Sequence, residues 1–179
     1  MDEQKTAVSQ DARHLAARAV MAYRASFPIQ DVALSSPNGR ETGIACDWKQ
    51  VRSTGVNDDT LIRRGFAFVY IGTIIDQGTS QEVSEDLRKE LATDMSDAIE
   101  ARRTAVEWGL VSSVNDANPF AHSGYKLASR LLRADRPLVE ELAAVLDAER
   151  YMDGSRLALW LDQRAEELSL EELEKLITY

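Results

Sequence analysis

The stretch TLIRRGFAFVYIGTIID, residues 60–76, is the most apolar part of the chain and decides how the rest can fold around it. Its apolar side chains recur at the three- and four-residue steps of a helical stripe, from Leu61 to Ile74. Residues 66–71 are also dense in strand-forming types, so a strand is the alternative. Apolar residues cover every face, so either element would be buried. We expect a buried helix.

Helical periodicity continues on both sides of this segment. Residues 9–27 place apolar side chains on one face, and Pro28 should end that helix because the residue before a proline is pushed out of the helical region. A capping box at residues 79–82 predicts the start of a second helix over 80–109, which Gly109 should close.

Residues 29–47 have a different pattern. Two short runs of alternating apolar and polar residues flank Asn38-Gly39, and such a dipeptide favours the tight turn of a hairpin because both residues accept positive φ. Residues 48–60 are expected to form a loop. The predicted fold is therefore mainly α, a bundle-like helical core with one small β-hairpin near residues 31–46, or α+β by strict count.

Residues 111–121 are predicted to be a connector, and short helices should follow it. One covers about 123–133, and another begins at Asp135 with Pro137 in its first turn, where a missing N–H does no harm. We expect an N-terminal helical unit over 1–112, and an acidic helical subdomain over 119–179 packed on the first.

The end of the chain predicts two further helices. Asp153-Gly154 should form a turn, and a helix should follow Ser155. The last helix begins at Ser169, which opens a second capping box. This helix is expected to bury Leu170, Leu173 and Leu176.

Charge is unevenly distributed. The net charge is −9, and residues 76–179 carry 22 acidic and 12 basic side chains. This excess disfavours nucleic acid as a partner, because nucleic-acid-binding proteins usually have a basic surface that replaces phosphate counterions. It favours a protein partner with a basic surface. The candidate interaction residues are Glu166, Glu167, Glu171 and Glu172.

The cellular setting follows from what the sequence contains. The longest strongly apolar run is shorter than a membrane span, and residues 1–5 have no signal-peptide character, so we expect no membrane association. Cys46 is the single cysteine, which cannot form an internal disulfide. Both points favour a cytoplasmic protein. Homo-oligomerisation is possible, because an apolar helical stripe in the sequence does not show whether the chain itself covers that stripe.

One short string suggests nucleic-acid binding. Residues 64–71, RGFAFVYI, resemble the octapeptide of RNA-recognition-motif domains at seven of eight positions, and Ile71 departs from it. The resemblance implies a strand on which Phe66 and Phe68 stack on bases while Arg64 contacts phosphate. The partner strand should supply another aromatic, but residues 29–36 contain none. The alternative is a buried core segment.

No catalytic residue is assigned. His14, His122 and Cys46 lack a partner in the sequence that would make a nucleophile–base pair. The acids Asp86, Glu90 and Asp97 share a helical face, yet the Glu-x-x-His motif of di-metal bundles is absent. We therefore expect no metal and no cofactor.

Three functional hypotheses follow. The first is a non-catalytic accessory or regulatory protein that acts through protein–protein contacts. The second is an RNA- or single-strand-binding module that uses residues 64–71. The third is a small metal-dependent hydrolase, for which the faint indication is the group Glu140, Glu141, Asp147 and Glu149.

Overall fold

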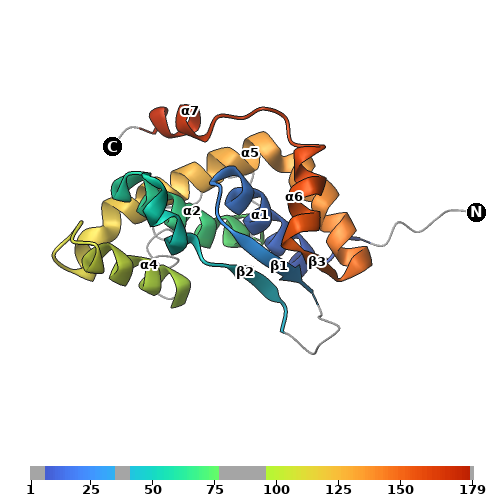
Figure 1. The fold of residues 1–179 in the computed structure, drawn as a ribbon, viewed down its shortest axis with the longest axis horizontal. Helices are drawn as coiled ribbons and strands as arrows, with labels where there is room; N and C mark the ends of the chain where they lie inside the picture. Colours follow the sequence, from blue (N-terminus) through green and yellow to red (C-terminus); the bar gives the residue numbers. More distant parts are fainter. Residues whose placement is uncertain (1–6, 35–40, 77–95, 178–179) are drawn as a thin grey trace, which may run out of the picture.

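The computed structural model describes residues 7–34, 41–76 and 96–177. Within these ranges the chain is mainly helical, with one small antiparallel sheet, so the predicted fold class is confirmed. Most of the core comes from three helices: α1 (Gln10–Arg24), α2 (Asp58–Asp76) and α5 (Asn118–Glu149). The helix α5 runs along most of the long axis of the molecule, and α1 and α2 pack against it (Figure 1).

The remaining elements cover this three-helix core. In chain order they are β1 (Ile29–Ala33), β2 (Gly43–Cys46), the 3-10 helix η1 (Trp48–Thr54), α4 (Ser96–Glu107), the 3-10 helix η2 (Val114–Ala117), β3 (Tyr151–Asp153), α6 (Gly154–Asp162) and α7 (Leu170–Lys175). The predicted loop over 48–60 thus contains a 3-10 helix in its first half.

Small side chains let α1 lie at the centre of the core. Five of its eight buried residues are alanines, and none of the five is exposed to solvent. They are Ala12, Ala16, Ala17, Ala19 and Ala22. Alanine faces allow helix axes to approach to about 8 Å, the lower end of the usual range.

The ends of α1 follow local rules. Ser9 is the N-cap, and its hydroxyl accepts a hydrogen bond from the Ala12 amide. The helix ends at Arg24, three residues before the expected end at Phe27. Ser26 adopts a left-handed conformation with φ of 56°, and the amide of Phe27 donates to the carbonyl of Ala22 at 2.8 Å. A left-handed turn, rather than Pro28 alone, therefore stops the helix.

The segment that decides the fold is helical. α2 buries Leu61, Phe66 and Ile71 completely, so the expected buried helix is confirmed and the strand alternative is wrong. α2 and α5 pack backbone to backbone at Gly124. A Cβ on Gly124 would lie 2.4 Å from the Cβ of Phe66 and 2.7 Å from the carbonyl oxygen of Arg63.

The hairpin is present and has a third strand. β1 pairs antiparallel with β2 and, on its other side, with β3, so the strand order is β2-β1-β3. Val32 lies at the centre, opposite Ile44 in β2 and Met152 in β3. Local patterning predicts the two-stranded hairpin, whereas β3 has only three residues and pairs across more than a hundred positions. The Asn38-Gly39 turn lies outside the described residues.

The two helices predicted on either side of residue 134, one over about 123–133 and one from Asp135, are a single helix. One helix, α5, runs from Asn118 to Glu149 with Pro137 inside it. Pro137 cannot donate to the carbonyl of Arg133, but both residues are exposed, so water can solvate that carbonyl. Asp135 does not cap a helix; its side chain is buried against Arg24 of α1.

The predicted helix over 80–109 can be compared only in part. Its capping box lies outside the described residues, and α4 covers 96–107, followed by Gly109 with φ of 73°. The buried face of α4 consists mostly of alanines and includes Arg102, whereas Ile99 and Val106 are half-buried.

The two predicted units share one core. A single cluster of buried side chains includes Leu15 and Phe66 from the first unit and Leu131 and Leu161 from the second. Whether 1–112 and 119–179 are separate folding units stays a prediction. No helix in the described ranges is long and apolar enough to cross a membrane.

Candidate interaction surface

Residues 163–177, here called the C-terminal strap, follow α6 and cross the molecule to end beyond α7 (Figure 1). The strap contains the four glutamates that the sequence singles out. Its first part, 165–169, has no regular structure, and α7 has only six residues. A segment with so little secondary structure needs tertiary contacts to stay in place, and the strap has two ionic anchors and an apolar one.

The first ionic anchor is Arg24 at the end of α1. Its guanidinium donates to both carboxylate oxygens of Asp135, at 2.8 and 2.9 Å, and a third nitrogen donates to the carbonyl oxygen of Glu166 at 2.8 Å. The side chains of Arg24 and Asp135 are only 7% and 10% exposed. A bidentate pair this well buried holds the guanidinium in one orientation, so the start of the strap is fixed to α1 and α5.

The second ionic anchor is Arg64 of α2. It donates to both carboxylate oxygens of Glu174 in α7, at 2.7 and 3.0 Å, and both side chains are largely buried. Glu174 is thus the acidic residue of α7 that faces the body of the protein. Arg64 has a structural role in this fold, and its charge is neutralised within the chain.

Apolar contacts and a cap complete the attachment. Leu170 and Ile177 are buried in the main core, and the Ser169 hydroxyl accepts from the Glu172 amide, so the predicted second cap is confirmed. The predicted burial is wrong for Leu176, which is 64% exposed. Ile177, one residue later and beyond the end of α7 at Lys175, takes the buried position.

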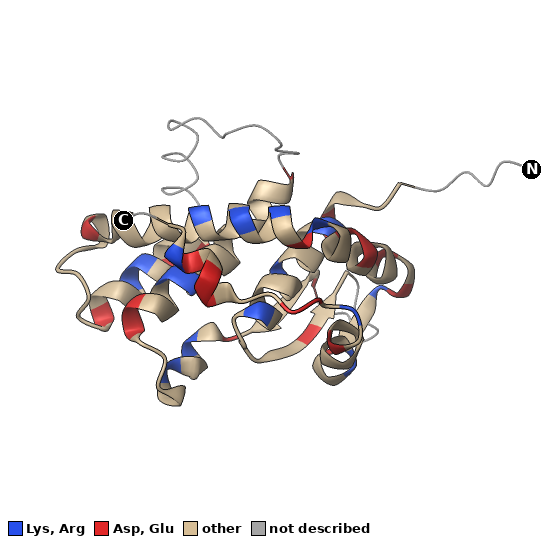
Figure 2. Cartoon of the chain, turned by 90° about the horizontal axis from the view of Figure 1, so that it is seen from above, with Lys and Arg blue, Asp and Glu red and all other residues tan. Residues whose placement is uncertain are grey.

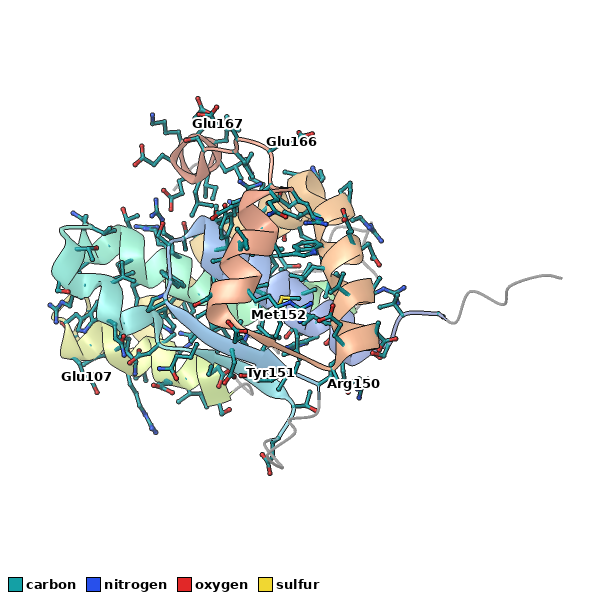
Figure 3. All side chains as sticks on the ribbon, turned by 45° about the vertical axis from the view of Figure 1, so that its right-hand side comes forward. Glu107, Arg150, Tyr151, Met152, Glu166 and Glu167 are labelled. Atoms are coloured by element: carbon teal, nitrogen blue, oxygen red, sulfur yellow. The ribbon has the colours of Figure 1, made fainter. Side chains whose placement is uncertain are left out.

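The four candidate residues Glu166, Glu167, Glu171 and Glu172 are all exposed. None forms an ion pair with another residue that the structure describes. Figure 3 shows Glu166 and Glu167 on the strap, on the opposite side of the molecule from Tyr151 in the sheet. The four glutamates form an anionic surface on the strap, which the buried residues Arg24 and Arg64 anchor to the helical core.

The octapeptide-like segment occupies a different environment from the one its resemblance implies. Residues 64–71 lie within α2, and Phe66 and Phe68 are 0% and 3% exposed. Phe66 stacks on Tyr70 with ring centroids 6.0 Å apart. The two aromatics have no open face on which a base could stack, and Arg64 binds Glu174 rather than facing solvent. The buried-core alternative fits these residues.

His14 and Cys46, two further residues considered for catalysis, also lie in surroundings typical of structural residues. The Nδ1 atom of His14 lies 2.7 Å from a carboxylate oxygen of Asp76, and the imidazole packs against Gly72, where a Cβ would come within 2.6 Å of the ring. Burial raises the pKa of the Cys46 thiol to about 12, although nearby Arg18 opposes the shift. Such a thiol is protonated at neutral pH and is a poor nucleophile.

The acidic side chains proposed for a metal are dispersed or paired. Glu140 binds Arg13 at 3.0 Å, Glu141 binds Arg164 at 3.0 Å, and Asp147 accepts from Ser9 at 2.6 Å. Glu149 is paired with Arg156. In the ranges that the structure describes, no three His, Cys, Asp or Glu side chains lie close enough to hold a metal ion.

Comparison with known proteins adds no identification. No protein-family model matches the sequence, and a search of curated proteins finds no similar one. Sequence reasoning selected the four glutamates from their charge and a cap. It missed Arg24, Arg64 and Asp135, which hold the strap, because nothing in the sequence links residues that lie more than a hundred positions apart.

Proposed function

We propose that this protein is a non-catalytic accessory or regulatory protein, and that it binds a protein partner through Glu166, Glu167, Glu171 and Glu172 of the C-terminal strap. The observation that carries the proposal is the anchoring of the strap. Two buried arginines fix its backbone and its inward carboxylate, while the four other carboxylates face solvent without a partner among the described residues.

Anchoring matters because binding is weakened by the entropy lost when a mobile segment becomes ordered. Immobilising one long side chain costs about 0.5–1.5 kcal/mol on association, and ordering a flexible backbone costs more. The strap is already held at the backbone carbonyl of Glu166 and at the side chain of Glu174. A partner with a basic surface would therefore meet a preorganised group of carboxylates, and long-range attraction would speed the encounter.

A cytoplasmic location belongs to the same proposal. The free thiol of Cys46 is half-buried, and a reducing compartment keeps such a thiol from oxidative coupling.

The test is quantitative affinity purification from the host cell at low salt, comparing the parent chain with two variants. The first variant carries Glu166→Gln, Glu167→Gln, Glu171→Gln and Glu172→Gln. The control variant neutralises four exposed acids elsewhere through Asp11→Asn, Glu41→Gln, Glu107→Gln and Asp116→Asn, so both variants lose the same charge.

We expect a stoichiometric protein partner with the parent and the control variant, and at least a tenfold lower recovery with the strap variant. Each exposed ion pair is worth up to about 1 kcal/mol, so four of them suffice for that loss. Equal recovery of the partner by both variants would mean that net charge, and not the strap, attracts it. A parent protein that elutes without any protein partner would contradict the proposal.

A further inference from the structure

The outward face of α5 carries four cations on successive turns: Lys126, Arg130, Arg133 and Arg136, here called the α5 basic stripe. At 3.6 residues per turn the four positions fall within about a third of the helix circumference. The core-facing residues Leu131 and Leu142 lie on the opposite side. Figure 2 shows the Lys and Arg positions following one another along the long helix.

The stripe is unusual because its cations have no ion-pair partner in the part of the chain that the structure describes. Among the described residues, ten other arginines and lysines form ion pairs. The four stripe residues form none with any residue that the structure describes; Arg133 and Arg136 are exposed, and Lys126 and Arg130 are half-buried. The chain has 30 acidic and 21 basic residues, so acids to pair with are plentiful. Four neighbouring cations without an ion-pair partner within residues 7–34, 41–76 and 96–177 therefore require an explanation.

Helix stability does not explain them. Cations stabilise the C-terminal end of a helix, where the macrodipole is negative, but α5 has no basic residue in its last turn and carries Asp147 and Glu149 near that end. Lys126 and Arg130 are four residues apart, and Arg130 and Arg133 three. Like charges at these spacings destabilise a helix by about 0.2–0.5 kcal/mol per pair. The stripe thus opposes folding slightly and favours a role outside it.

The free energies of the possible contacts favour a polyanion over an acidic protein as the ligand of the stripe. An exposed ion pair between proteins contributes about 0–1 kcal/mol. A cation that binds a nucleic-acid phosphate also releases a condensed counterion, which adds a favourable entropy that grows as salt is lowered. The stripe extends about 15 Å along the helix, which matches about four nucleotide steps of one strand at 3.4 Å each. Arginine, which supplies three of the four cations, binds phosphate oxygens in a bidentate manner.

A membrane surface fits less well. Stable attachment of a helix to a bilayer needs an apolar face beside the cations. The large apolar side chains that are exposed in the described ranges are Val114, Leu159 and Leu176, and none of them is on α5. The aromatic neighbour on α5, Tyr125, is buried. Without an exposed aromatic or a groove-reading loop, the stripe has no means to read bases.

We propose that the α5 basic stripe binds the phosphodiester backbone of nucleic acid without sequence preference. Residues 76–179 have a negative net charge, and this charge, counted along the sequence, disfavours nucleic acid as a partner. In the folded chain most of the acids of that half that the structure describes form ion pairs or lie on the strap, whereas these cations are gathered on one helix. The site is separate from the four strap glutamates, so either proposal can fail without the other.

The experiment is fluorescence anisotropy with a labelled DNA duplex of mixed sequence, titrated at salt concentrations from about 20 to about 200 mM. For four phosphate contacts we expect the plot of log affinity against log salt to have a slope of about −3.6. The stripe variant carries Lys126→Gln, Arg130→Gln and Arg133→Gln. The control variant, Arg103→Gln, Arg156→Gln and Lys175→Gln, removes the same charge from exposed positions on other elements.

The stripe variant should bind at least thirtyfold more weakly at low salt, with a slope near −1, while the control stays within about threefold of the parent. The proposal is overturned if the parent fails to bind at low salt, or if both variants weaken equally. It is also overturned if polyglutamate competes as well as unlabelled DNA. Stripe-dependent binding to phosphatidylserine vesicles in the absence of DNA binding would assign the stripe to a membrane instead.

Discussion

At the scale of single residues, Gly124 shows how closely α2 and α5 approach. A Cβ there would meet the Cβ of Phe66 and backbone atoms of Arg63 and Ala67, and not the movable end of a side chain, so the two helices would have to separate. We expect Gly124→Ala to lower the free energy of unfolding by about 1–3 kcal/mol, the range for overpacked cores. Thermal unfolding measures the effect. Gly43→Ala is the control, because a Cβ on Gly43 has open space around it and should change little.

Cys46 gives a prediction about pH. In the folded chain its pKa is raised to about 12 by burial, whereas an unfolded chain has an ordinary thiol. Between these two pKa values the folded state holds a proton that the unfolded state has lost, so stability falls as pH rises through that range. Below the unfolded pKa the thiol contributes no pH dependence.

Two measurements check this. Alkylation of Cys46 near pH 9 should be at least about a hundredfold slower in the folded protein than in denaturant, because the thiolate is the reactive form. The parent should also lose more stability than Cys46→Ala between about pH 8 and pH 10. Equal alkylation rates in the two states would show that the thiol is not held protonated.

At the scale of elements, the C-terminal strap depends on its arginine anchors. Arg64→Gln removes the charge that binds Glu174, so α7 should detach more often while the three-helix core stays intact. Hydrogen exchange should become faster in peptides from residues 163–177 and stay unchanged in α1 and in the buried part of α5. Arg103→Gln, at an exposed position of α4, should leave both regions as they are.

Uniform loss of protection over the whole chain would mean that the Arg64–Glu174 pair supports the global fold instead of the strap alone. An unchanged strap would mean that Leu170 and Ile177 hold it without the ion pair.

Elements that depend on local chemistry could be predicted from the sequence. The helical stripe over 60–76, the pair β1–β2 and the Ser169 cap each follow from residues a few positions apart. The continuous α5 could not be predicted, because Pro137 and Asp135 favour a helix start locally. The contact between Asp135 and Arg24, which lie 111 positions apart, overrides that preference.

The candidate interaction surface could likewise be predicted only in part. The exposure of Glu166, Glu167, Glu171 and Glu172 could be anticipated from a charged run. Their fixed presentation could not, because it depends on Arg24 and Arg64. The α5 basic stripe was hidden for a related reason, since a predicted helix break at Asp135 separates Arg136 from the other three cations.

At the scale of the whole molecule, the shared core predicts cooperative unfolding. Buried side chains of α1 and α2 pack with those of α5, so neither predicted unit buries its own apolar surface alone. We expect a single thermal transition in which near-ultraviolet and far-ultraviolet circular dichroism change together. A fragment comprising residues 119–179 should be largely unfolded by the same measurements. Two separate transitions, or a folded fragment, would support independent domains.

The alanines of α1 have a consequence for how the sequence can vary over time. Each of the five is completely buried, and a larger side chain in a packed core typically costs about 1–3 kcal/mol of stability. Substitutions there should be rejected by selection far more often than changes among the exposed acids. The spacing of Ala12, Ala16 and Ala19 is therefore the feature by which a diverged descendant of the same ancestor could be recognised after its surface has changed.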